Sequence, residues 1–326
     1  MEEPRTLQEA IICYNDYANC HEFMMSLRWP DGKVTCPRCG SDHVVYLENP
    51  RVWKCYGKHD HAKFSLKTGT VFEDSPIGLD KWLTAVWTLT KAKNGVSSHE
   101  MHRSIGVTQK TAWFMTQRIR LAMQQGGIVK ATGQVELDET FIGGKARNMH
   151  KRIRARKITG TGGKDKTMVI GVLQRSGKVR VSVKGSRKKR PLQTHVKAHV
   201  EPGAEVFTDA LKSYEGLEGD YLHQVVDHAV EFVKGHVHTN GLENFWSLLK
   251  RTLKGTYVSV EPFHLFRYLD EQAFRYNERK HDQGDSGRFQ GVVKGIYGRR
   301  LTYKQLTGKA KYGHEGHHNE FAARTV

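Results

Sequence analysis

The sequence lacks any long apolar run. No stretch approaches the roughly 18 consecutive apolar residues that a membrane-spanning helix needs, so we expect no membrane partner. The opening residues M-E-E-P-R-T-L-Q contain no basic segment followed by an apolar core, so a secretory signal is not expected. Cysteine is also scarce: the five cysteines are an odd number and all lie within the first 55 residues. A disulfide framework is therefore not expected, and a reducing compartment such as the cytoplasm fits better.

Acidic residues are in short supply. The chain has 34 of them against 52 lysines and arginines, which gives a net charge of +18. Basic runs such as K-R-I-R-A-R-K (151–157) and R-K-K-R (187–190) concentrate this excess. Such a balance favours a polyanionic partner, because neutralising phosphates releases counterions, and nucleic acid is the first candidate. With 326 residues the chain can hold two or three domains.

The cysteines near residue 40 have the spacing of metal ligands. C-P-R-C-G places Cys36 and Cys39 two residues apart, and K-C-Y-G-K-H supplies Cys55 and His59 after a strand-like segment. Thiolates and an imidazole in a tetrahedral group suit zinc, and four protein ligands would make the site structural. His61 competes with His59 as the fourth ligand; we prefer His59 because it closes the tighter loop. Cys13 and Cys20, in a helix-like segment, are expected to be small buried residues.

Three helices are predicted after the ribbon. Apolar residues recur at helical spacing over 79–90, and a short helix over 97–106 precedes a longer one over 107–123. Gly106 provides the turn and Thr108 the N-cap, which is the outline of a helix-turn-helix. The second helix of such a pair presents its first residues to the bases, here Gln109, Lys110 and Thr111.

The pattern changes to strands from residue 133. G-Q-V-E-L-D-E-T-F-I-G-G, K-T-M-V-I-G-V-L-Q-R, K-V-R-V-S-V-K-G and A-E-V-F-T-D-A read as strands, and P-L-Q-T-H-V-K-A-H-V reads as a helix. This order predicts a mixed sheet with helices on its faces. Asp138 lies on the first strand and Asp209 ends a later one.

A polar stripe marks the predicted helix T-N-G-L-E-N-F-W-S-L-L-K-R (239–251). Helical spacing places Asn240, Glu243, Ser247 and Lys250 on one side and a group of apolar residues on the other. An exposed Glu and Lys alone would be an ordinary solvated pair. Asp138, Asp209 and Glu243 together would repel one another unless divalent cations neutralised them. Two such cations can support in-line phosphoryl transfer.

Several of these motifs together resemble a known family. V-E-L-D-E-T-F-I-G-G-K, F-T-D-A-L-K-S-Y and H-T-N-G-L-E-N-F-W-S-L-L-K-R are similar to the zinc-ribbon DDE transposases of bacterial insertion sequences, the ISXO-two-like group. The resemblance implies an RNase H-like α/β domain with a mixed five-stranded sheet, and it makes the chain an α+β multidomain protein. It also implies a catalytic Mg²⁺ or Mn²⁺ bound by Asp138, Asp209 and Glu243, with Lys250 as the associated basic residue. Whether Asn240 is a ligand, orients one or caps the helix stays open; we favour Glu243 as third ligand, because a carboxylate binds magnesium more strongly than an amide.

The basic run after the first catalytic strand is expected to be a flexible arm along the DNA backbone, with a solvated loop as the alternative. Its residues are Arg147, Lys151, Arg152, Arg154, Arg156 and Lys157. K-I-T-G-T-G-G-K-D-K-T lacks Ser or Thr after G-K, so no nucleotide cofactor is expected.

These features predict four segments: an N-terminal helix and zinc ribbon (1–75), a helix-turn-helix domain (76–130), a catalytic domain (131–285) and a C-terminal extension (286–326). The predicted protein is a nucleoid-associated transposase that binds terminal inverted repeats, cleaves at them and joins the 3′-OH ends to target DNA. A homodimer or higher oligomer on double-stranded DNA is expected. One alternative is a transposase-derived DNA-binding regulator without catalysis; another is a metal-dependent nuclease that does not join ends.

Overall fold

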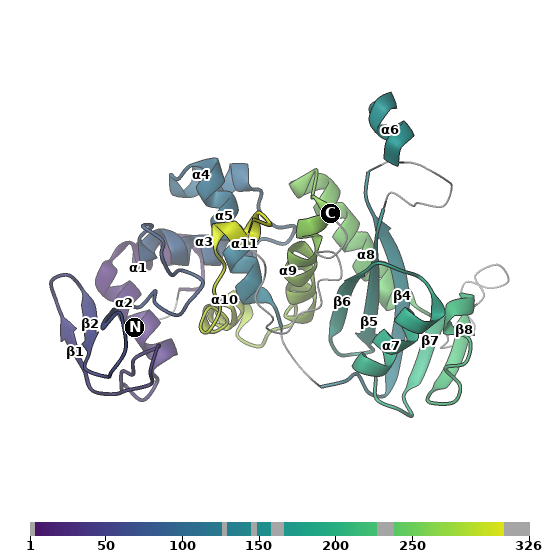
Figure 1. Cartoon of the computed structure of the whole chain (residues 1–326), viewed down its shortest axis with the longest axis horizontal. Helices are drawn as coiled ribbons and strands as arrows, with labels where there is room; N and C mark the ends of the chain where they lie inside the picture. The colour runs from purple at the N-terminus through teal and green to yellow at the C-terminus, as the bar shows by residue number, and fades with distance from the viewer. Residues whose placement is uncertain (1–3, 126–128, 145–148, 158–165, 227–237, 310–326) are drawn as a thin grey trace. The chain divides into compact units, whose positions relative to one another are not determined.

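The structure is a computed structural model that describes residues 4–125, 129–144, 149–157, 166–226 and 238–309. The chain forms two compact units (Figure 1). Among the described residues, one unit contains those up to Gln124 together with 278–309, and the other spans Gln125–Asn277. The first unit is therefore formed by two separate stretches of the chain, and the second unit is inserted between them.

The N-terminal unit combines a small sheet with helices. Its β1, β2 and β3 form an antiparallel sheet in sequence order. The elements are α1 (Leu7–Asn15), α2 (Tyr17–Arg28), β1 (Val44–Leu47), β2 (Val52–Cys55), β3 (Lys63–Phe64), α3 (Leu79–Lys91), α4 (Ser98–Ile105), α5 (Gln109–Met123), α10 (Gly284–Lys294) and α11 (Tyr303–Leu306).

Helix α3 is the core helix of this unit. Its Trp82, Leu83, Val86 and Trp87 are all buried, so it is covered on most sides. The following pair, α4 and α5, is joined at Gly106, whose left-handed backbone (φ 61°) ends α4. Thr108 caps α5, as the sequence indicates: its side chain accepts a hydrogen bond from the Thr111 N–H.

The C-terminal segment completes the same unit. The Val71 N–H donates to the carbonyl of Ile296 at 3.1 Å, and the Tyr297 hydroxyl donates to the carbonyl of Met24 at 3.1 Å. The buried Arg118 of α5 donates through Nε to the carbonyl of Leu301 at 3.1 Å. These bonds join residues far apart in sequence, so the unit needs both ends of the chain.

The second unit is built on a five-stranded mixed sheet with the order β6-β5-β4-β7-β8. Strands β4, β5 and β6 pair antiparallel, whereas β7 runs parallel to β4 and β8 parallel to β7. The mixed five-stranded sheet is thus confirmed. Its elements are β4 (Gln134–Ile142), α6 (Lys151–Lys157), β5 (Thr167–Gln174), β6 (Val179–Lys184), α7 (Lys189–His199), β7 (Glu205–Asp209), η2 (Lys212–Tyr214), β8 (Leu222–Val226), α8 (Asn240–Thr252), η3 (Leu253–Tyr257), η4 (Pro262–His264) and α9 (Leu265–Asn277).

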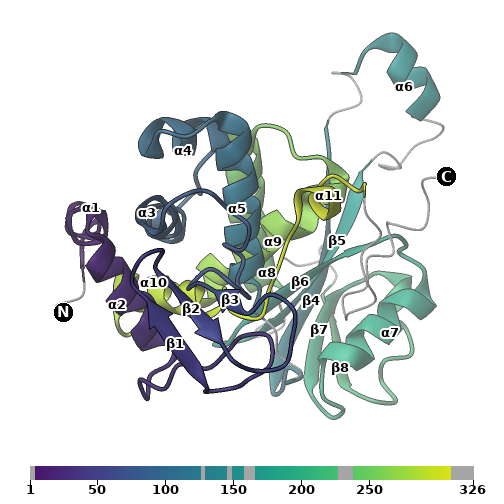
Figure 2. The ribbon, with the colours of Figure 1, turned by 60° about the vertical axis from the view of Figure 1, so that its left-hand side comes forward.

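Helices cover both faces of this sheet (Figures 1 and 2). Val135 and Leu137 of β4 point into one core, which contains Leu192 and Val196 of α7. Val169 and Leu173 of β5 belong to the opposite core, together with residues of α8 and α9. Because side chains alternate along a strand, Glu136 and Asp138 of β4 face α8.

Gly171 of β5 lets α8 approach the sheet closely. A Cβ at this position would lie 2.7 Å from Leu242 Cδ2 and 2.7 Å from Trp246 Cζ2. Gly171 is paired with Asp138 of the neighbouring strand β4. The closest contact between helix and sheet thus lies beside the first predicted catalytic residue.

Among the described residues, we find no helix that combines the length and the apolar character needed to cross a membrane.

Replacing Gly171 by Ala is expected to push α8 away from the sheet. The added methyl group meets two buried side chains, and overpacking of this kind costs about 1–3 kcal/mol in the free energy of unfolding. Urea denaturation measures the loss. Gly185→Ala is the matched control, because a Cβ there meets no atom within 4 Å. Equal stabilities of the two variants would show that α8 does not pack as described.

Candidate active site

Two aspartates meet where β4 and β7 stop pairing. The parallel register between these strands runs from Gln134↔Glu205 to Glu136↔Phe207. Asp138 and Asp209 each lie two residues beyond that last pair, on strands that begin to diverge. The end of a paired segment of parallel strands leaves an open position between them, which is where α/β proteins bind ligands.

Three carboxylates gather at this position. Asp138, Glu139 and Asp209 each offer an oxygen, and these oxygens all lie within 4.8 Å of one another. All three side chains are half-buried. The sequence predicts Asp138 and Asp209 here, and the structure brings both together. Glu243, the expected third member, is not in this group; Glu139 is.

Glu139 is a site residue that the sequence reading missed. Strict alternation places it on the opposite face of β4 from Asp138, but the divergence from β7 leaves room for its side chain to reach Asp209. Burial raises the pKa of Glu139 to about 7, even though a hydrogen bond from the Tyr214 hydroxyl acts to lower it. The D-E pair in V-E-L-D-E-T-F and the tyrosine in F-T-D-A-L-K-S-Y were the available signals.

Asp138 is held by two hydrogen bonds. Its Oδ1 accepts from the Glu139 N–H at 2.8 Å, and its Oδ2 accepts from the Trp246 indole Nε1–H at 2.9 Å. Burial raises the pKa of Asp138 to about 6, and the negative charges of Asp209 and Glu243 act in the same direction. Glu243 of α8 is therefore close enough to Asp138 to interact with its charge.

Helix α8 has the two faces that the sequence predicts. Leu242, Phe245, Trp246 and Leu249 are buried. The opposite side carries the exposed residues Asn240, Glu243, Ser247 and Lys250. Helix α8 begins at Asn240, and the N-cap position belongs to Thr239. The alternative that Asn240 is the N-cap is therefore wrong, because the chain enters the helix one residue earlier.

The carboxylate group fits a hard divalent cation. Mg²⁺ takes oxygen ligands and is usually held by one or two carboxylates, with waters and substrate phosphates completing its shell. Burial raises the pKa values of Asp138 and Glu139, and the negative charges of the neighbouring carboxylates raise them further, so both groups are costly to ionise without a cation. A bound cation would remove that cost.

A second group of ligands lies in the ribbon. Cys36, Cys39, Cys55 and His59 present ligand atoms that all lie within 4.8 Å of one another. Cys36 Sγ is 3.5 Å from His59 Nε2, and Cys39 Sγ is 3.6 Å from Cys55 Sγ. Four ligands around zinc, with Zn–S bonds of about 2.3 Å, lie roughly 3.8 Å apart at tetrahedral angles. The donor set and its spacing therefore fit structural zinc, and the predicted Cys/His group is present.

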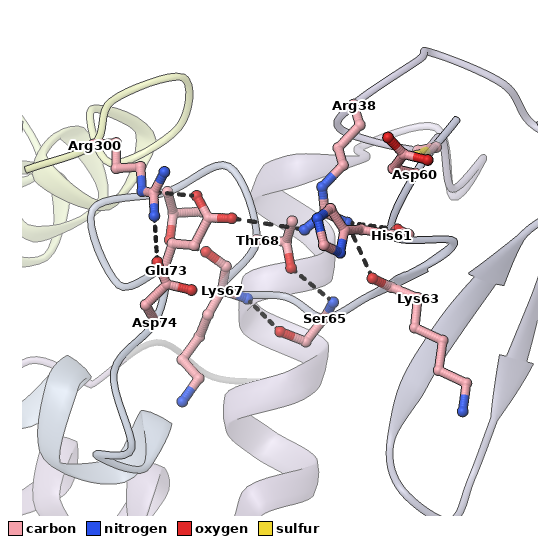
Figure 3. Close-up of polar contacts among 12 residues, drawn as sticks. Arg38, Asp60, His61, Lys63, Ser65, Lys67, Thr68, Glu73, Asp74 and Arg300 are labelled. Carbon is pink, nitrogen blue, oxygen red and sulfur yellow. Dashed lines mark hydrogen bonds and ion pairs between the residues drawn. The ribbon is translucent and has the colours of Figure 1, made fainter. Parts of the chain in front are cut away.

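Of the two candidate histidines, the group includes His59. Its Nδ1 lies 2.6 Å from the carbonyl oxygen of Asp60, so a proton on Nδ1 leaves Nε2 free to face Cys36. His61 instead has its carbonyl oxygen 3.0 Å from Arg38 Nη1, which also donates to the Lys63 carbonyl at 3.0 Å (Figure 3). Arg38, which lies between Cys36 and Cys39, thus holds the backbone of the segment that follows His59.

Figure 3 also shows how the ribbon is joined to its own unit. Glu73 Oε1 lies 3.8 Å from Arg38 Nη2, and Glu73 Oε2 lies 3.6 Å from Arg300 Nε. Arg300 also pairs with Asp74. One loop carboxylate therefore links the metal-binding turn to the C-terminal segment.

The predicted base-reading residues occupy the first turn of α5. Gln109 Nε2 donates to Ser98 Oγ at 2.8 Å, and Thr111 Oγ1 lies 2.8 Å from Thr108 Oγ1. Lys110 is exposed, with its Nζ 4.9 Å from the centre of the Tyr303 ring. The structure thus places all three residues at the start of the second helix of the α4–α5 pair.

The basic arm is partly helical. Lys151, Arg152 and Arg154 are exposed on α6, and Arg156 and Lys157 belong to the same helix. Arg147 lies outside the described residues. Helix α6 stands beyond the ends of β4 and β5 (Figure 1). The segment 151–157 is therefore not a loop, and its charges are spaced along a short helix; the expected contact with the DNA backbone stays a prediction.

Comparison with known proteins finds matches for both parts of the chain that carry these groups. Residues 130–277 match the ISXO2-like transposase domain, and residues 16–57 match the transposase zinc-ribbon domain. A Halobacterium salinarum protein, described as an uncharacterized protein in transposable element ISH50, is 29% identical over 242 residues. The match covers 71% of this chain and 81% of that protein.

A zinc ribbon followed by a mixed sheet with clustered carboxylates defines a class, the DDE transposases with an N-terminal ribbon. Within that class, residues 130–277 resemble the ISXO2-like transposase domain and residues 16–57 resemble its zinc ribbon, and the related Halobacterium protein also comes from a transposable element. The resemblance drawn from the sequence motifs is confirmed.

Replacing one ribbon ligand is expected to remove the structural zinc. Cys39→Ser or Cys55→Ser should lose the metal and lower the melting temperature of the protein, because so short a segment depends on its metal to fold. Zinc content by atomic emission, with thermal denaturation, measures both effects. Cys13→Ser is the control, since Cys13 lies outside the ligand group. Full zinc content in Cys39→Ser would contradict the assignment.

Metal binding at the carboxylate group is expected to depend on pH. Asp138, with a pKa of about 6, carries a proton in mildly acidic solution that a cation must displace, and the neighbouring Glu139, with a pKa of about 7, adds its negative charge only as it loses its own proton. Mn²⁺ affinity should therefore rise with pH up to roughly pH 7 and then level off. Calorimetric titration at several pH values measures it, with Asp138→Asn as the control. An affinity that does not change with pH would contradict these pKa shifts.

Proposed function

We propose that this protein cleaves phosphodiester bonds at the ends of an insertion sequence and joins the freed 3′-OH ends to target DNA. The observation that carries the proposal is the meeting of Asp138 and Asp209, with α8 attached to Asp138 through the Trp246 indole. The exposed polar face of α8 presents Glu243, Asn240 and Lys250 along one side of a helix fixed to the sheet. Carboxylates, an amide and a positively charged lysine at one sheet edge suit metal-assisted phosphoryl transfer.

An RNase H-like fold is the second part of the proposal. Three antiparallel strands followed by two parallel ones, in the order β6-β5-β4-β7-β8, support it. In this arrangement the first strand, β4, is central and carries Asp138, while its parallel neighbour β7 carries Asp209. We keep residues 131–285 as the catalytic segment.

Each residue has a separate role in the proposed site. Asp138 and Asp209 would hold divalent metal, and Glu243 would be the third ligand. Glu243 is exposed, so its side chain can rotate toward the aspartates. Glu139 is instead engaged by Tyr214. When bound, the cations would supply an activated nucleophile and stabilise the leaving oxygen.

The other two polar residues of α8 would act on the ligand and on the substrate. Asn240, one turn before Glu243, would orient that carboxylate or bind the metal itself. Lys250 would contact a DNA phosphate near the point of cleavage as a point charge.

We assign DNA recognition to the N-terminal segments, with the ribbon in 1–75 and a helix-turn-helix in 76–130. The α4–α5 pair, with its Gly106 turn and capped second helix, supports this assignment. Gln109, Lys110 and Thr111 would face the bases of the terminal inverted repeats, and the basic residues of α6 would contact phosphates. The C-terminal extension from 286 packs in the N-terminal unit as far as it is described, so we propose that it supports DNA binding.

Two element ends must be processed together, so we propose a homodimer or higher oligomer on double-stranded DNA. We also propose that the protein acts in the cytoplasm, on the nucleoid. Ribbon cysteines that would hold zinc rather than form disulfides support a reducing compartment.

Cleavage and joining of end-labelled DNA test the proposal. The substrates are fragments of the DNA that flanks the coding sequence, incubated with Mg²⁺ or Mn²⁺. Asp138→Asn, Asp209→Asn and Glu243→Gln are each expected to abolish both reactions while the variants still fold and bind DNA. Asn240→Ala is expected to be milder, about 10–100-fold slower, because it would act through a neighbouring ligand.

Comparison of variants and substrates separates the alternatives. Full strand transfer by Glu243→Gln with loss in Glu139→Gln would make Glu139 the third ligand. Loss in Asn240→Ala alone would give that role to the asparagine. Tight sequence-specific binding by the wild type without cleavage would indicate a DNA-binding regulator. Cleavage without joining of pre-cleaved ends would indicate a nuclease.

A further inference from the structure

We infer that Glu136 is the positioning residue of the catalytic helix: its buried carboxylate fixes the start of α8 and so sets Glu243 beside Asp138. This inference rests on the proposed function, since it concerns the same site. Glu136 lies on β4 two residues before Asp138, on the face that α8 covers. Its exposed fraction is only 1%, which is rare for a carboxylate and requires partners.

The first partner is the backbone of α8. Glu136 Oε2 accepts a hydrogen bond from the Leu242 N–H at 3.0 Å. Leu242 is the third residue of the helix, and its N–H is among the four that no helical carbonyl can satisfy. A negative charge at this end also interacts favourably with the helix dipole. Glu136 therefore acts as a cap supplied by the sheet, because the N-cap Thr239 makes no side-chain cap bond.

The second partner is Arg175, which joins the same carboxylate to the segment before α8. Arg175 Nε donates to Glu136 Oε1 at 3.0 Å, and Arg175 Nη2 donates to the carbonyl of His238 at 2.6 Å. The guanidinium carbon lies 3.9 Å from the centre of the Phe207 ring, on the strand that ends at Asp209. One arginine thus contacts β4, β7 and the chain that enters α8.

Gly241 makes the contact with Glu136 possible. A Cβ at this position would lie 2.8 Å from Glu136 Oε2 and 2.4 Å from Leu173 Cδ2. A side chain would therefore separate the helix start from the carboxylate. The glycine of the N-G-L-E motif is explained by this close approach.

Helix α8 is consequently attached to β4 at two points. Leu242 binds Glu136, and Trp246 binds Asp138. Four helical residues span about 6 Å and two strand residues about 6.6 Å, so the two spacings match. Glu243 lies between these attachment points in sequence. Loss of the first attachment would leave the second, at Trp246, together with apolar packing, which does not fix the position of the helix along the strand.

Glu136→Gln tests the inference with little change in volume. It keeps one acceptor oxygen but removes the charge that pairs with Arg175. Two readouts are used: the indole N–H resonance of Trp246 in metal-free protein, assigned with Trp246→Phe, and Mn²⁺ affinity by calorimetry. We expect the resonance to shift and the affinity to fall about 10–100-fold, as for residues that orient metal ligands.

Glu271→Gln is the matched control. Glu271 is also 1% exposed and also pairs with an arginine, Arg275, in the same unit. It should lose stability without shifting the Trp246 resonance or weakening Mn²⁺ binding. Glu136→Gln that behaves like this control would overturn the inference.

A second variant covers the case in which Glu136→Gln does not fold. Arg175→Lys keeps a charge for Glu136 but loses the fork that reaches the His238 carbonyl, so both readouts should change in the same direction by a smaller amount. Unchanged readouts in Arg175→Lys would also overturn the inference. If wild-type protein binds no Mn²⁺ through Asp138, the proposed function fails, while the Trp246 resonance still decides whether Glu136 positions α8.

Discussion

The hydrogen bond between the Trp246 indole and Asp138 is the contact on which the arrangement of the site depends. It joins the helix that carries Glu243 to the strand that carries the first aspartate. Gly171 allows the indole to lie against β5, and the apolar face of α8 fills the core beneath it. The same docking leaves the polar face of α8 in solvent, where metal and DNA can reach it. The contact between Trp246 and Asp138 thus contributes both to the packing of α8 on the sheet and to the geometry of the site.

The two groups of ligands would use a bound metal differently. In the ribbon, four ligands surround one position, so a bound zinc would be closed to substrate and would stabilise the fold. At the sheet edge, half-buried carboxylates leave coordination positions for water and phosphate. The net charge of +18 favours a polyanionic partner such as DNA, and the exposed lysine and arginines of α6 place part of that charge in the unit that contains Asp138 and Asp209.

Several features of the fold and the site could be predicted from the sequence, because they follow from local residue patterns. The ribbon ligands follow from cysteine spacing, the two faces of α8 from helical period, and Thr108 from capping preference. Glu139 could not be found this way, since its place beside Asp209 depends on where β4 and β7 stop pairing. Glu136 was hidden for a similar reason: a glutamate in a strand reads as exposed until the partners that bury it, Arg175 and the Leu242 N–H, are known.

Anomalous diffraction from crystals grown with Mn²⁺ tests the central claim most directly, because it locates the metal relative to α8 and β4. The account predicts manganese between Asp138 and Asp209, with a Glu243 oxygen in its coordination shell and the Trp246–Asp138 hydrogen bond intact. Manganese held by Asp138, Glu139 and Asp209 with Glu243 turned to solvent would contradict the role of α8 as the helix that completes the site.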